Sequence, residues 1–407
     1  MTETSRIGNK RLIALLFGIM FVAVADNQMI SPLLPDLMSA FSMDAGQAGL
    51  LVSVYAIAAA AVSFGLGPLS DSWGRRKMLF AGLIVFTTAT LMCGLAWDYA
   101  SMVAFRAVTG AAAGTLSLNV TASIGDHFPY KRRGAAMGMV MSGYFTAMIL
   151  GVPAGAFIAE AWSWRWAFCA FAGAGLLLWL PALAVLPSRA QVVRGANIID
   201  MVKRYRRFLV RTGPLSVVAA SFLVSASTVG FITFVGTWLR DIYGLSTDWI
   251  GMIFLFAGLG ALLGSPLAGH LSDRVGKRRI VVGSGLAMAV LLAGIPWITD
   301  LLPMVFAGFI LTGIAGAFRH APLQALVTAM ATDEERGALI ALKNTVAEIG
   351  IATGTALCGV LYVAFGYGSV GAACGVMAAA ASLIILRWVS EPGDPGEPGG
   401  PDEKGPG

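Results

Sequence analysis

The most regular feature of this chain is a succession of long apolar segments separated by short polar ones. A helix needs about 20 apolar residues to cross the hydrocarbon of a bilayer. Windows of that size predict spans at 12–34, 47–69, 78–96, 100–124, 135–159, 167–187, 214–237, 249–270, 280–298, 303–327, 338–362 and 367–387. The alternating ten-residue segments of barrel strands do not occur. The pattern therefore predicts an all-α integral membrane protein with twelve transmembrane helices.

Composition supports the same class of protein. The chain is 57% hydrophobic and 12% charged, whereas a soluble domain carries about 25% charged residues. Its 50 glycines suit transmembrane helices, because small residues let helices approach closely. The apolar run that begins at Leu12 leads directly into further spans, which predicts a retained first anchor rather than a cleaved signal peptide. The four cysteines lie in apolar runs without metal-ligand spacing, so they are predicted to be packing residues, and we predict no metal site.

The distribution of positive charge predicts the orientation in the membrane. Cytoplasmic loops of membrane proteins are enriched in Lys and Arg. Here most of the 28 basic residues fall in alternate loops, and the opposite set of loops holds only Arg165 and Arg240. Both termini are therefore expected on the cytoplasmic side of a plasma membrane, such as a bacterial inner membrane. This asymmetry also explains the net charge of +6 without a nucleic-acid partner.

The central basic loop divides the chain into two halves of six spans. We expect an N-terminal bundle at 1–187, the cytoplasmic loop at 188–213 and a C-terminal bundle at 214–390. Within the loop, Val202–Leu209 is consistent with an amphipathic segment on lipid, but a solvated linker is the favoured interpretation. The acidic, Pro/Gly-rich tail at 391–407 is predicted to be disordered.

The two halves repeat one another. GPLSDSWGRRK at 67–77 recurs as GHLSDRVGKRR at 269–279, an offset of 202 residues, and two further pairs of short motifs repeat at offsets of 203 and 204. Three anchors at nearly one offset are not expected by chance. Repeated halves are the architecture from which secondary transporters build alternating access around a site at the middle of the membrane.

These motifs resemble those of a known family. The duplicated G-x-L-S-D-x-x-G-[RK]-R loop is similar to the signature loop of the major facilitator superfamily. RAVTG at 106–110 resembles the fourth-span motif of that family, and GVPAG at 151–155 resembles the fifth-span motif of its antiporter branches. WRWAF at 164–168 is similar to the loop before the sixth span in bacterial drug and metabolite exporters. The resemblance covers all but the tail and implies the twelve-span drug/metabolite:proton antiporter branch.

The resemblance also implies a conformational latch that holds the halves in the outward-facing state. Its residues are Gly67, Asp71, Gly74, Arg75, Asp126, Gly269, Asp273, Gly276 and Lys277. On physical grounds, the first glycine of each loop permits close helix approach, and each aspartate can face the positive end of a neighbouring helix. Arg75 is expected to pair with Asp126, and Lys277 with the acidic run at 333–335. The alternative is a positive-inside loop with a helix cap.

Small residues recur in the fifth span at Gly143, Gly151 and Gly155, around Pro153. Such a stripe predicts tight helix packing, and this can be its whole role. The family resemblance adds that a rigid fifth span accompanies exporters that do not leak protons.

Two carboxyl groups are predicted at membrane depth. Asp26 lies beside Asn27 in the first span, and Glu348 lies one turn after Asn344 in the eleventh. Ionisable groups at this depth usually face the interior of the bundle, where burial disfavours the charged form. Asp26 and Glu348 are therefore the candidates for proton coupling. The alternative is a structural carboxylate neutralised by a fixed cation, and Arg106 in the fourth span can offset Asp26.

Further polar groups interrupt the tenth span. Arg319 keeps its proton, so it is predicted to be a counter-ion or an anion-binding group. His320 can titrate near neutrality, although a hydrogen-bonded wall residue is the favoured interpretation, and Gln324 lies one turn beyond. These residues, with Asn27, Arg106 and Asn344, are the candidates for the substrate cavity. Lys343 is expected to extend toward the membrane surface.

The favoured hypothesis is a proton-coupled exporter of a small organic or amphipathic solute, driven by the proton gradient and needing no cofactor. We expect a monomer in the lipid bilayer and no enzyme, because catalytic constellations are absent. Aromatic and methionine side chains can line the cavity or face lipid, namely Met137, Met139, Met141, Phe231 and Phe234. One alternative is a symporter or uniporter that imports a small metabolite, for example an anionic one. Another is a non-transporting sensor or scaffold, which would require a cytoplasmic domain that the short loop and tail do not provide.

Overall fold

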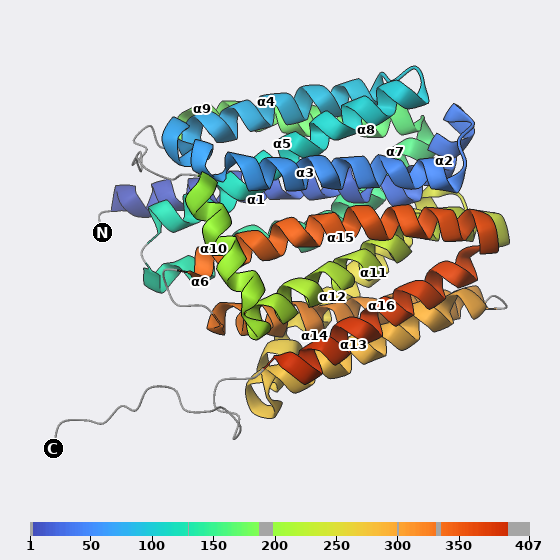
Figure 1. The fold of residues 1–407 in the computed structure, drawn as a ribbon. Coiled ribbons are helices and arrows are strands. Elements are labelled where there is room, and N and C mark those ends of the chain that lie inside the picture. Colours follow the sequence, from blue (N-terminus) through green and yellow to red (C-terminus); the bar gives the residue numbers. More distant parts are fainter. Residues whose placement is uncertain (1–2, 129, 187–197, 299–300, 331–334, 390–407) are drawn as a thin grey trace.

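The computed structural model describes residues 3–128, 130–186, 198–298, 301–330 and 335–389, and every element among them is helical (Figure 1). The N-terminal half contains α1 (Glu3–Gln28), α2 (Ile30–Phe41), α3 (Ala45–Trp73), α4 (Arg75–Gly94), α5 (Tyr99–His127), α6 (Tyr130–Thr146), the π-helix η1 (Ala147–Gly151), α7 (Val152–Ala161), α8 (Trp164–Leu177) and α9 (Trp179–Val185). The C-terminal half contains α10 (Ile198–Val210), α11 (Thr212–Tyr243), α12 (Thr247–Val275), α13 (Lys277–Gly294), the 3-10 helix η2 (Ile295–Trp297), α14 (Leu302–Ala329), α15 (Arg336–Phe365) and α16 (Tyr367–Trp388).

The twelve predicted spans correspond to these helices, and the prediction of the fold class is confirmed. Four spans are divided. The first becomes α1 and α2, and the fifth becomes α6, η1 and α7, in each case beside prolines. A proline ring cannot donate a backbone hydrogen bond and clashes with the carbonyl four residues earlier, which breaks or distorts a helix. The sixth becomes α8 and α9, and the ninth becomes α13 and η2.

One span differs from the rest in its polarity. Eleven helices of the described chain are long and apolar enough to cross a membrane. The remaining predicted span is α5, which is long enough at 29 residues but buries polar side chains such as Arg106, Thr109 and Asn119. The fourth span is therefore a helix with polar side chains buried inside the bundle.

At the start of α5, Asp98 caps the first turn by accepting a hydrogen bond from the Ser101 amide at 2.7 Å, and this bond holds the pKa of the Asp98 carboxyl below its usual value.

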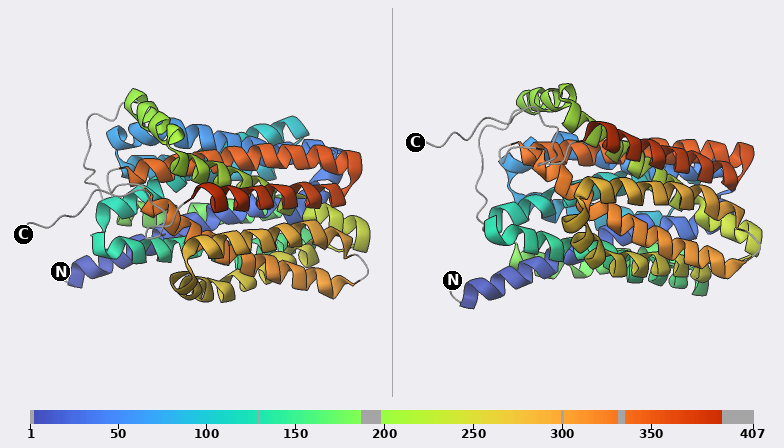
Figure 2. Two further views of the ribbon diagram at one scale, coloured as in Figure 1. Left: turned by 60° about the horizontal axis from the view of Figure 1, so that its bottom comes forward. Right: turned by 90° about the horizontal axis from the view of Figure 1, so that it is seen from below.

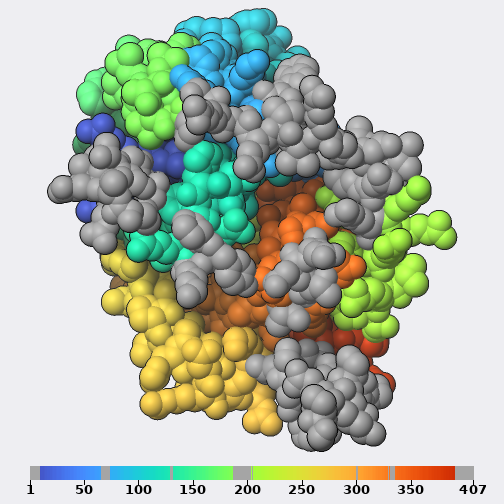
Figure 3. Space-filling model, turned by 90° about the vertical axis from the view of Figure 1, so that its left-hand side faces the viewer, coloured from blue at the N-terminus to red at the C-terminus, as the bar shows by residue number. Residues whose placement is uncertain are grey.

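The two halves form two layers of lengthwise helices that meet where α3 lies beside α15 (Figures 1 and 2). We call the end with the α2–α3, α7–α8 and α11–α12 connections the closed end, because α2 and α7 pack there against α11 and α12 of the other half. The opposite end, where α1 begins, is the open end. Its surface is hollowed between α6 in teal and α14 and α15 in orange (Figure 3).

Part of the predicted central loop is a packed helix. The helix α10 carries Tyr205 and Phe208, which are buried, while Arg206 and Arg207 are exposed. The Tyr205 ring lies 5.6 Å from that of Phe64 on α3, so α10 contacts both halves at the open end. Tyr205 and Phe208 of this segment are therefore packed against protein, which differs from the favoured interpretation of a solvated linker, while Leu209 stays exposed. Residues 187–197 and the predicted disordered tail lie outside the described part of the chain.

The outer surface is apolar, as a bilayer requires. Large side chains such as Leu180, Val290 and Phe365 are about three-quarters exposed, at 75%, 73% and 75%. A soluble monomer rarely exposes contiguous apolar surface on this scale. The described cysteines are free, and Cys358 and Cys374 pack with their sulfurs 3.5 Å apart.

Candidate functional site

A buried ion pair lies between the first and fourth spans. Asp26 on α1 and Arg106 on α5 have fully buried side chains, and Arg106 Nη1 lies 3.0 Å from Asp26 Oδ2. Arg106 Nη2 also donates to Asn27 Oδ1 at 3.1 Å. The second carboxylate oxygen of Asp26 has no hydrogen-bond partner among the described residues. A buried pair of this kind can accept a proton at the free oxygen, which would weaken its hold on the arginine.

The ring of Tyr55 on α3 completes this group. Arg106 Cζ lies 4.4 Å from the centroid of the Tyr55 ring, which is a cation–π contact. The fourth-span motif explains why α3 comes so close: a Cβ at Gly110 would lie 2.2 Å from the Tyr55 carbonyl oxygen. Only glycine fits there. Tyr55 was not among the predicted site residues, because this contact joins helices that are distant in the sequence.

A second group of polar residues lies in the C-terminal half. Arg319 on α14 is 6% exposed and donates from Nη2 to Thr228 Oγ1 at 2.9 Å. Lys343 on α15 donates to Gln324 Oε1 on α14 at 2.8 Å. The ammonium group of Lys343 therefore has a partner on the neighbouring helix, and Lys343 stays partly exposed. His320 is exposed and interacts electrostatically with both Arg319 and Lys343.

Glu348 lies nearer to the interface between the halves. It interacts electrostatically with Tyr55 and with Tyr144 of α6, both in the N-terminal half. Tyr144 in turn accepts a hydrogen bond from Gln28 Nε2 at 3.5 Å. Asn344, one turn before Glu348, is exposed. The two predicted proton-coupling carboxyls thus belong to different halves and share Tyr55 as a neighbour.

The first latch loop forms the pair expected from the sequence. Arg75 Nε lies 3.1 Å from Asp126 Oδ2, and the pair joins the start of α4 to the end of α5 within the N-terminal half. Gly74 has a φ of 91°, a conformation that favours glycine, and it begins α4. The surroundings of Gly67 and the side chain of Asp71, at the end of α3, lie outside the described part of the chain.

The second latch loop has the same backbone but different contacts. Gly276 has a φ of 101° and begins α13. Lys277 Nζ lies 3.6 Å from Asp273 Oδ1, one turn earlier. The acidic run at 333–335 was expected to bind Lys277, and its last residue, Glu335, pairs with Arg211 at 3.1 Å. Asp333 and Glu334 lie outside the described residues.

The expected close helix approach at Gly269 is wrong for this conformation. A Cβ there would meet none of the described atoms within 4 Å.

The small residues of the fifth span do pack closely. A Cβ at Gly143 would lie 2.9 Å from the Phe17 carbonyl oxygen, one at Gly151 would lie 2.6 Å from Ala25 Cβ, and one at Gly155 would lie 3.0 Å from the Phe171 ring. This face therefore lies against α1 and α8. Pro153 follows the π-helical turn η1, and such turns are frequent at functional sites.

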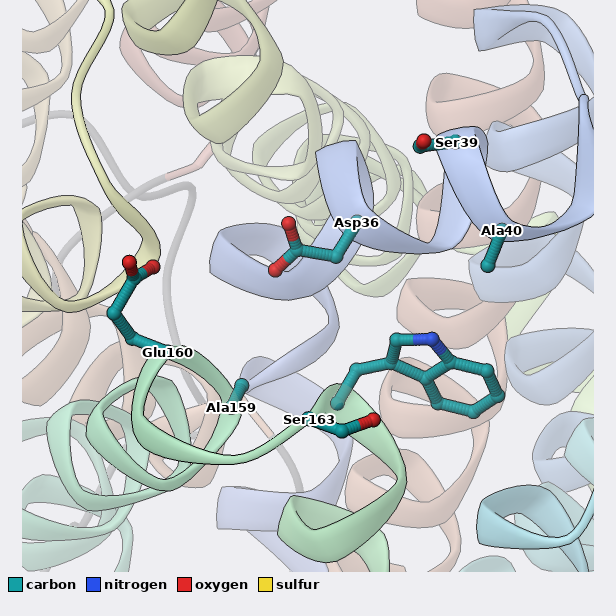
Figure 4. Close-up of a pocket in the computed structure, with 7 residues that line it drawn as sticks. Asp36, Ser39, Ala40, Ala159, Glu160 and Ser163 are labelled. Atoms are coloured by element: carbon teal, nitrogen blue, oxygen red, sulfur yellow. The ribbon is translucent and has the colours of Figure 1, made fainter.

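A polar network that the sequence alone did not predict joins the halves at the closed end. Asp36 on α2 pairs with Arg240 on α11 and also accepts from Thr247 Oγ1 at 2.7 Å. Arg240 Nη2 donates to the same Thr247 hydroxyl at 2.6 Å, and the Thr247 amide donates to Glu160 Oε2 at 2.9 Å. Asp36 and Glu160 also line a pocket of about 340 Å³ with Ser39 and neighbouring residues (Figure 4).

One signal in the sequence could have identified this network. Asp36 and Arg240 are 204 residues apart, which matches the offset of the internal repeat. Oppositely charged residues at equivalent positions of two repeats can meet where the halves face one another.

Of the aromatic and methionine side chains predicted to line a cavity or face lipid, only some are exposed. Phe231 and Phe234 are fully buried among other aromatic rings, so they neither line a cavity nor face lipid. Met139 is 48% exposed, whereas Met137 and Met141 pack against the N-terminal core. Within the described residues, no three His, Cys, Asp or Glu side chains are arranged to hold a metal ion.

Comparisons with known proteins show the family. Residues 16–257 and 217–406 match the sequence profile of the Major Facilitator Superfamily. The chain is 30% identical over 379 residues to the uncharacterised MFS-type transporter YwfA of Bacillus subtilis, covering 93% of this chain and 90% of that protein. It is also 30% identical over 351 residues to the uncharacterised MFS-type transporter YceJ of the same organism, covering 86% and 88%.

Two solved structures share the fold. A bacterial homologue of the human lysosomal transporter Spinster, in an inward-facing and unoccupied conformation, gives a TM-score of 0.71 at 18% identity, with 96% of both chains covered. A D-xylose-proton symporter gives a TM-score of 0.74 at 19% identity, with 95% of this chain and 98% of that one covered.

Proposed function

Because the chain belongs to the Major Facilitator Superfamily of transporters, we propose that it is a proton-coupled antiporter that exports a small organic solute by alternating access. The observation that carries this proposal is the buried Asp26–Arg106 pair. A carboxylate at membrane depth marks a proton or substrate pathway by default. Protonation at the free oxygen of Asp26 would remove the negative charge that holds Arg106, so the pair can link proton binding to a rearrangement of α1 and α5.

The contacts between the halves support alternation. At the closed end, the Asp36–Arg240–Thr247 network and the bond from Ser53 Oγ to the Ala352 carbonyl at 2.7 Å join them. With both termini in the cytoplasm, as the positive charges predict, the open end faces inward. Opening to the outside then requires the closed-end network to break, while the latch loops approach each other at the other end.

The test uses purified protein in liposomes that contain a trapped pH-sensitive dye. Lipophilic cations, organic anions, sugars and nucleosides are added singly under an imposed proton gradient. We expect a solute-dependent proton flux that disappears in Asp26→Asn and in Glu348→Gln. Asp44→Asn is the matched control, because Asp44 is an exposed carboxylate that caps Gln47 and an asparagine caps equally well. Full proton coupling in both of the first two variants would refute the mechanism.

The second candidate is import of an anionic solute by symport. It is favoured by the absence of any described carboxylate paired with Arg319. The sign of the dye response separates the candidates whichever way the protein inserts. External solute makes the lumen more alkaline in antiport and more acidic in symport.

A further inference from the structure

Arg319 is a buried cation for which the described residues supply no acidic partner. Its side chain is 94% buried, yet only Nη2 is bonded, to the neutral Thr228 hydroxyl. Nη1 is buried and has no hydrogen-bond partner among the described residues. An arginine keeps its charge even in an apolar setting, and leaving such a charge uncompensated at membrane depth is costly. The position therefore requires an anion that the neighbouring side chains do not supply.

The surroundings of Arg319 add to the positive charge. His320 and Gln324 are one turn apart and share a face of α14. Lys343 reaches that face from α15 through its bond to Gln324. Both Arg319 and Lys343 interact electrostatically with His320. We call Arg319, His320, Gln324 and Lys343 the basic cluster.

Three members of the basic cluster are exposed or partly exposed, and Arg319 is buried beside them. His320 is exposed, Lys343 and Gln324 are partly exposed, and α14 and α15 border the hollow in Figure 3. A helix rises about 1.5 Å per residue. Along α14, Gln324 therefore lies about 8 Å from the end of the helix at Ala329, and Arg319 about 15 Å from it. A solute entering from the open end would pass the outer members of the cluster and reach the arginine deepest.

Glu348 does not neutralise the cluster in this conformation. It forms no ion pair with Arg319 or Lys343 among the described residues, and its electrostatic neighbours are Tyr55 and Tyr144 across the interface. Tyr144 also interacts electrostatically with Arg319, so it is a neighbour of the cluster from the N-terminal half.

We propose that the basic cluster binds the anionic group of the transported solute, so that the substrate is a small organic anion carrying a carboxylate or phosphate. The arginine fork offers parallel N–H donors that match the two oxygens of such a group. Lys343 adds a point charge nearer the open end. This inference rests on the proposed transport function, but it concerns binding and needs no proton gradient.

The test is ligand binding to the purified protein in detergent, followed by the shift in thermal unfolding. Benzoate, succinate, glucuronate and glucose 6-phosphate are compared with neutral glucose and with tetraphenylphosphonium, a cation. We expect at least one anion to stabilise the protein, and the neutral and cationic solutes to have no effect. Arg319→Gln removes a charged hydrogen-bond partner and should lower the affinity for that anion about tenfold to a hundredfold. Arg319→Lys should retain part of the affinity, and Arg387→Gln, an exposed charge on α16, should retain all of it.

Two further variants keep the test informative if Arg319→Gln does not fold. Thr228→Asp would place a carboxylate beside Arg319 and should abolish anion binding while leaving the arginine compensated. Lys343→Gln should weaken binding from the more exposed side of the cluster. Unchanged anion affinity in these variants would overturn the proposal, as would stabilisation by none of the anions. Because no gradient is present, anion binding that persists in Asp26→Asn separates this inference from proton coupling.

Discussion

The two halves of the molecule each bury one arginine in corresponding helices, the fourth and tenth spans, and surround it in opposite ways. Arg106 contacts a carboxylate, an amide and an aromatic ring, from Asp26, Asn27 and Tyr55. Arg319 contacts one hydroxyl, from Thr228, and belongs to the same cluster as the partly exposed ammonium group of Lys343. The buried arginine is thus neutralised by a neighbouring carboxylate in the N-terminal half and left positively charged in the C-terminal half.

The difference separates two tasks that a coupled transporter must perform. A compensated arginine holds a carboxylate whose protonation changes the contact, which suits an ion site. An uncompensated arginine attracts an anion from outside, which suits a solute site. Under the proposed function, this difference supports a proton site at Asp26 in the N-terminal half and a solute site at Arg319 in the C-terminal half, with Glu348 of the C-terminal half near Tyr55 and Tyr144.

The largest expected effect is on folding stability when Arg106 is replaced. Arg106→Gln leaves the Asp26 carboxylate buried without a cation, and breaking a buried pair in this way costs about 3–5 kcal/mol. Arg319→Gln removes one hydrogen bond to a neutral group, which contributes about 1 kcal/mol. Thermal unfolding in detergent should therefore show a much larger loss for Arg106→Gln than for Arg319→Gln.

A double variant serves as the control for that difference. Arg106→Gln combined with Asp26→Asn removes both charges and should recover most of the lost stability, but not proton coupling. Equal destabilisation by the two single arginine variants would mean that Arg319 has an internal counter-charge after all, and the comparison would fail.

Arg240 tests whether a substitution has a different result when the carboxylate partner lies in the other half. The carboxylate partner of Arg240, Asp36, belongs to the other half. Arg240→Gln should therefore shift the balance of conformations rather than the stability of either half. The lost charged hydrogen bonds contribute about 1.5–3 kcal/mol. The fraction of molecules in which the two halves have separated at this end should therefore rise about tenfold or more.

The readout for Arg240 is the labelling of a cysteine buried between the halves. Ser31 is 4% exposed and bonds to the Ile232 carbonyl across the interface. Ser31→Cys, in a protein without the native cysteines, should react about tenfold faster with a thiol reagent once Arg240→Gln is added. Arg165→Gln is the matched control, because Arg165 bonds the Gly94 and Ala96 carbonyls within one half. Slow labelling in both variants would exclude the network as a gate.

The positions of the spans and of the buried charges could be predicted from the sequence, for different physical reasons. Bilayer thickness fixes the length of an apolar helix, so hydropathy alone locates the spans. Buried charges need partners, so Asp26 and Arg106 were expected to offset one another, and Arg319 was expected to bind an anion or act as a counter-ion. Both statements follow from the cost of charge in an apolar medium, which does not depend on the details of packing.

The remaining contacts depend on which helices become neighbours. Lys343 was expected to extend to the membrane surface, because a single span offers it no partner, and only the placement of α14 beside α15 provides Gln324. The apolar side of α10 was assigned to a solvated loop, because its contact with Phe64 comes from a helix more than 100 residues away in the sequence. Composition and spacing carry no direct information on such pairs.

The smallest expected effect concerns the aromatic ring that distinguishes Arg106 from Arg319. The Tyr55 ring lies 4.4 Å from Arg106 Cζ, and a desolvated cation–π contact contributes about 1 kcal/mol. Tyr55→Leu should lower the thermal stability modestly and slow solute-dependent proton flux, whereas Tyr55→Phe, which keeps the ring, should match the parent protein in both measurements. If Tyr55→Phe is as defective in proton flux as Tyr55→Leu while remaining as stable as the parent, then the hydroxyl, which interacts electrostatically with both Asp26 and Glu348, takes part in coupling the two carboxyls. The two halves would then be joined at Tyr55 through its hydroxyl rather than through the face of its ring.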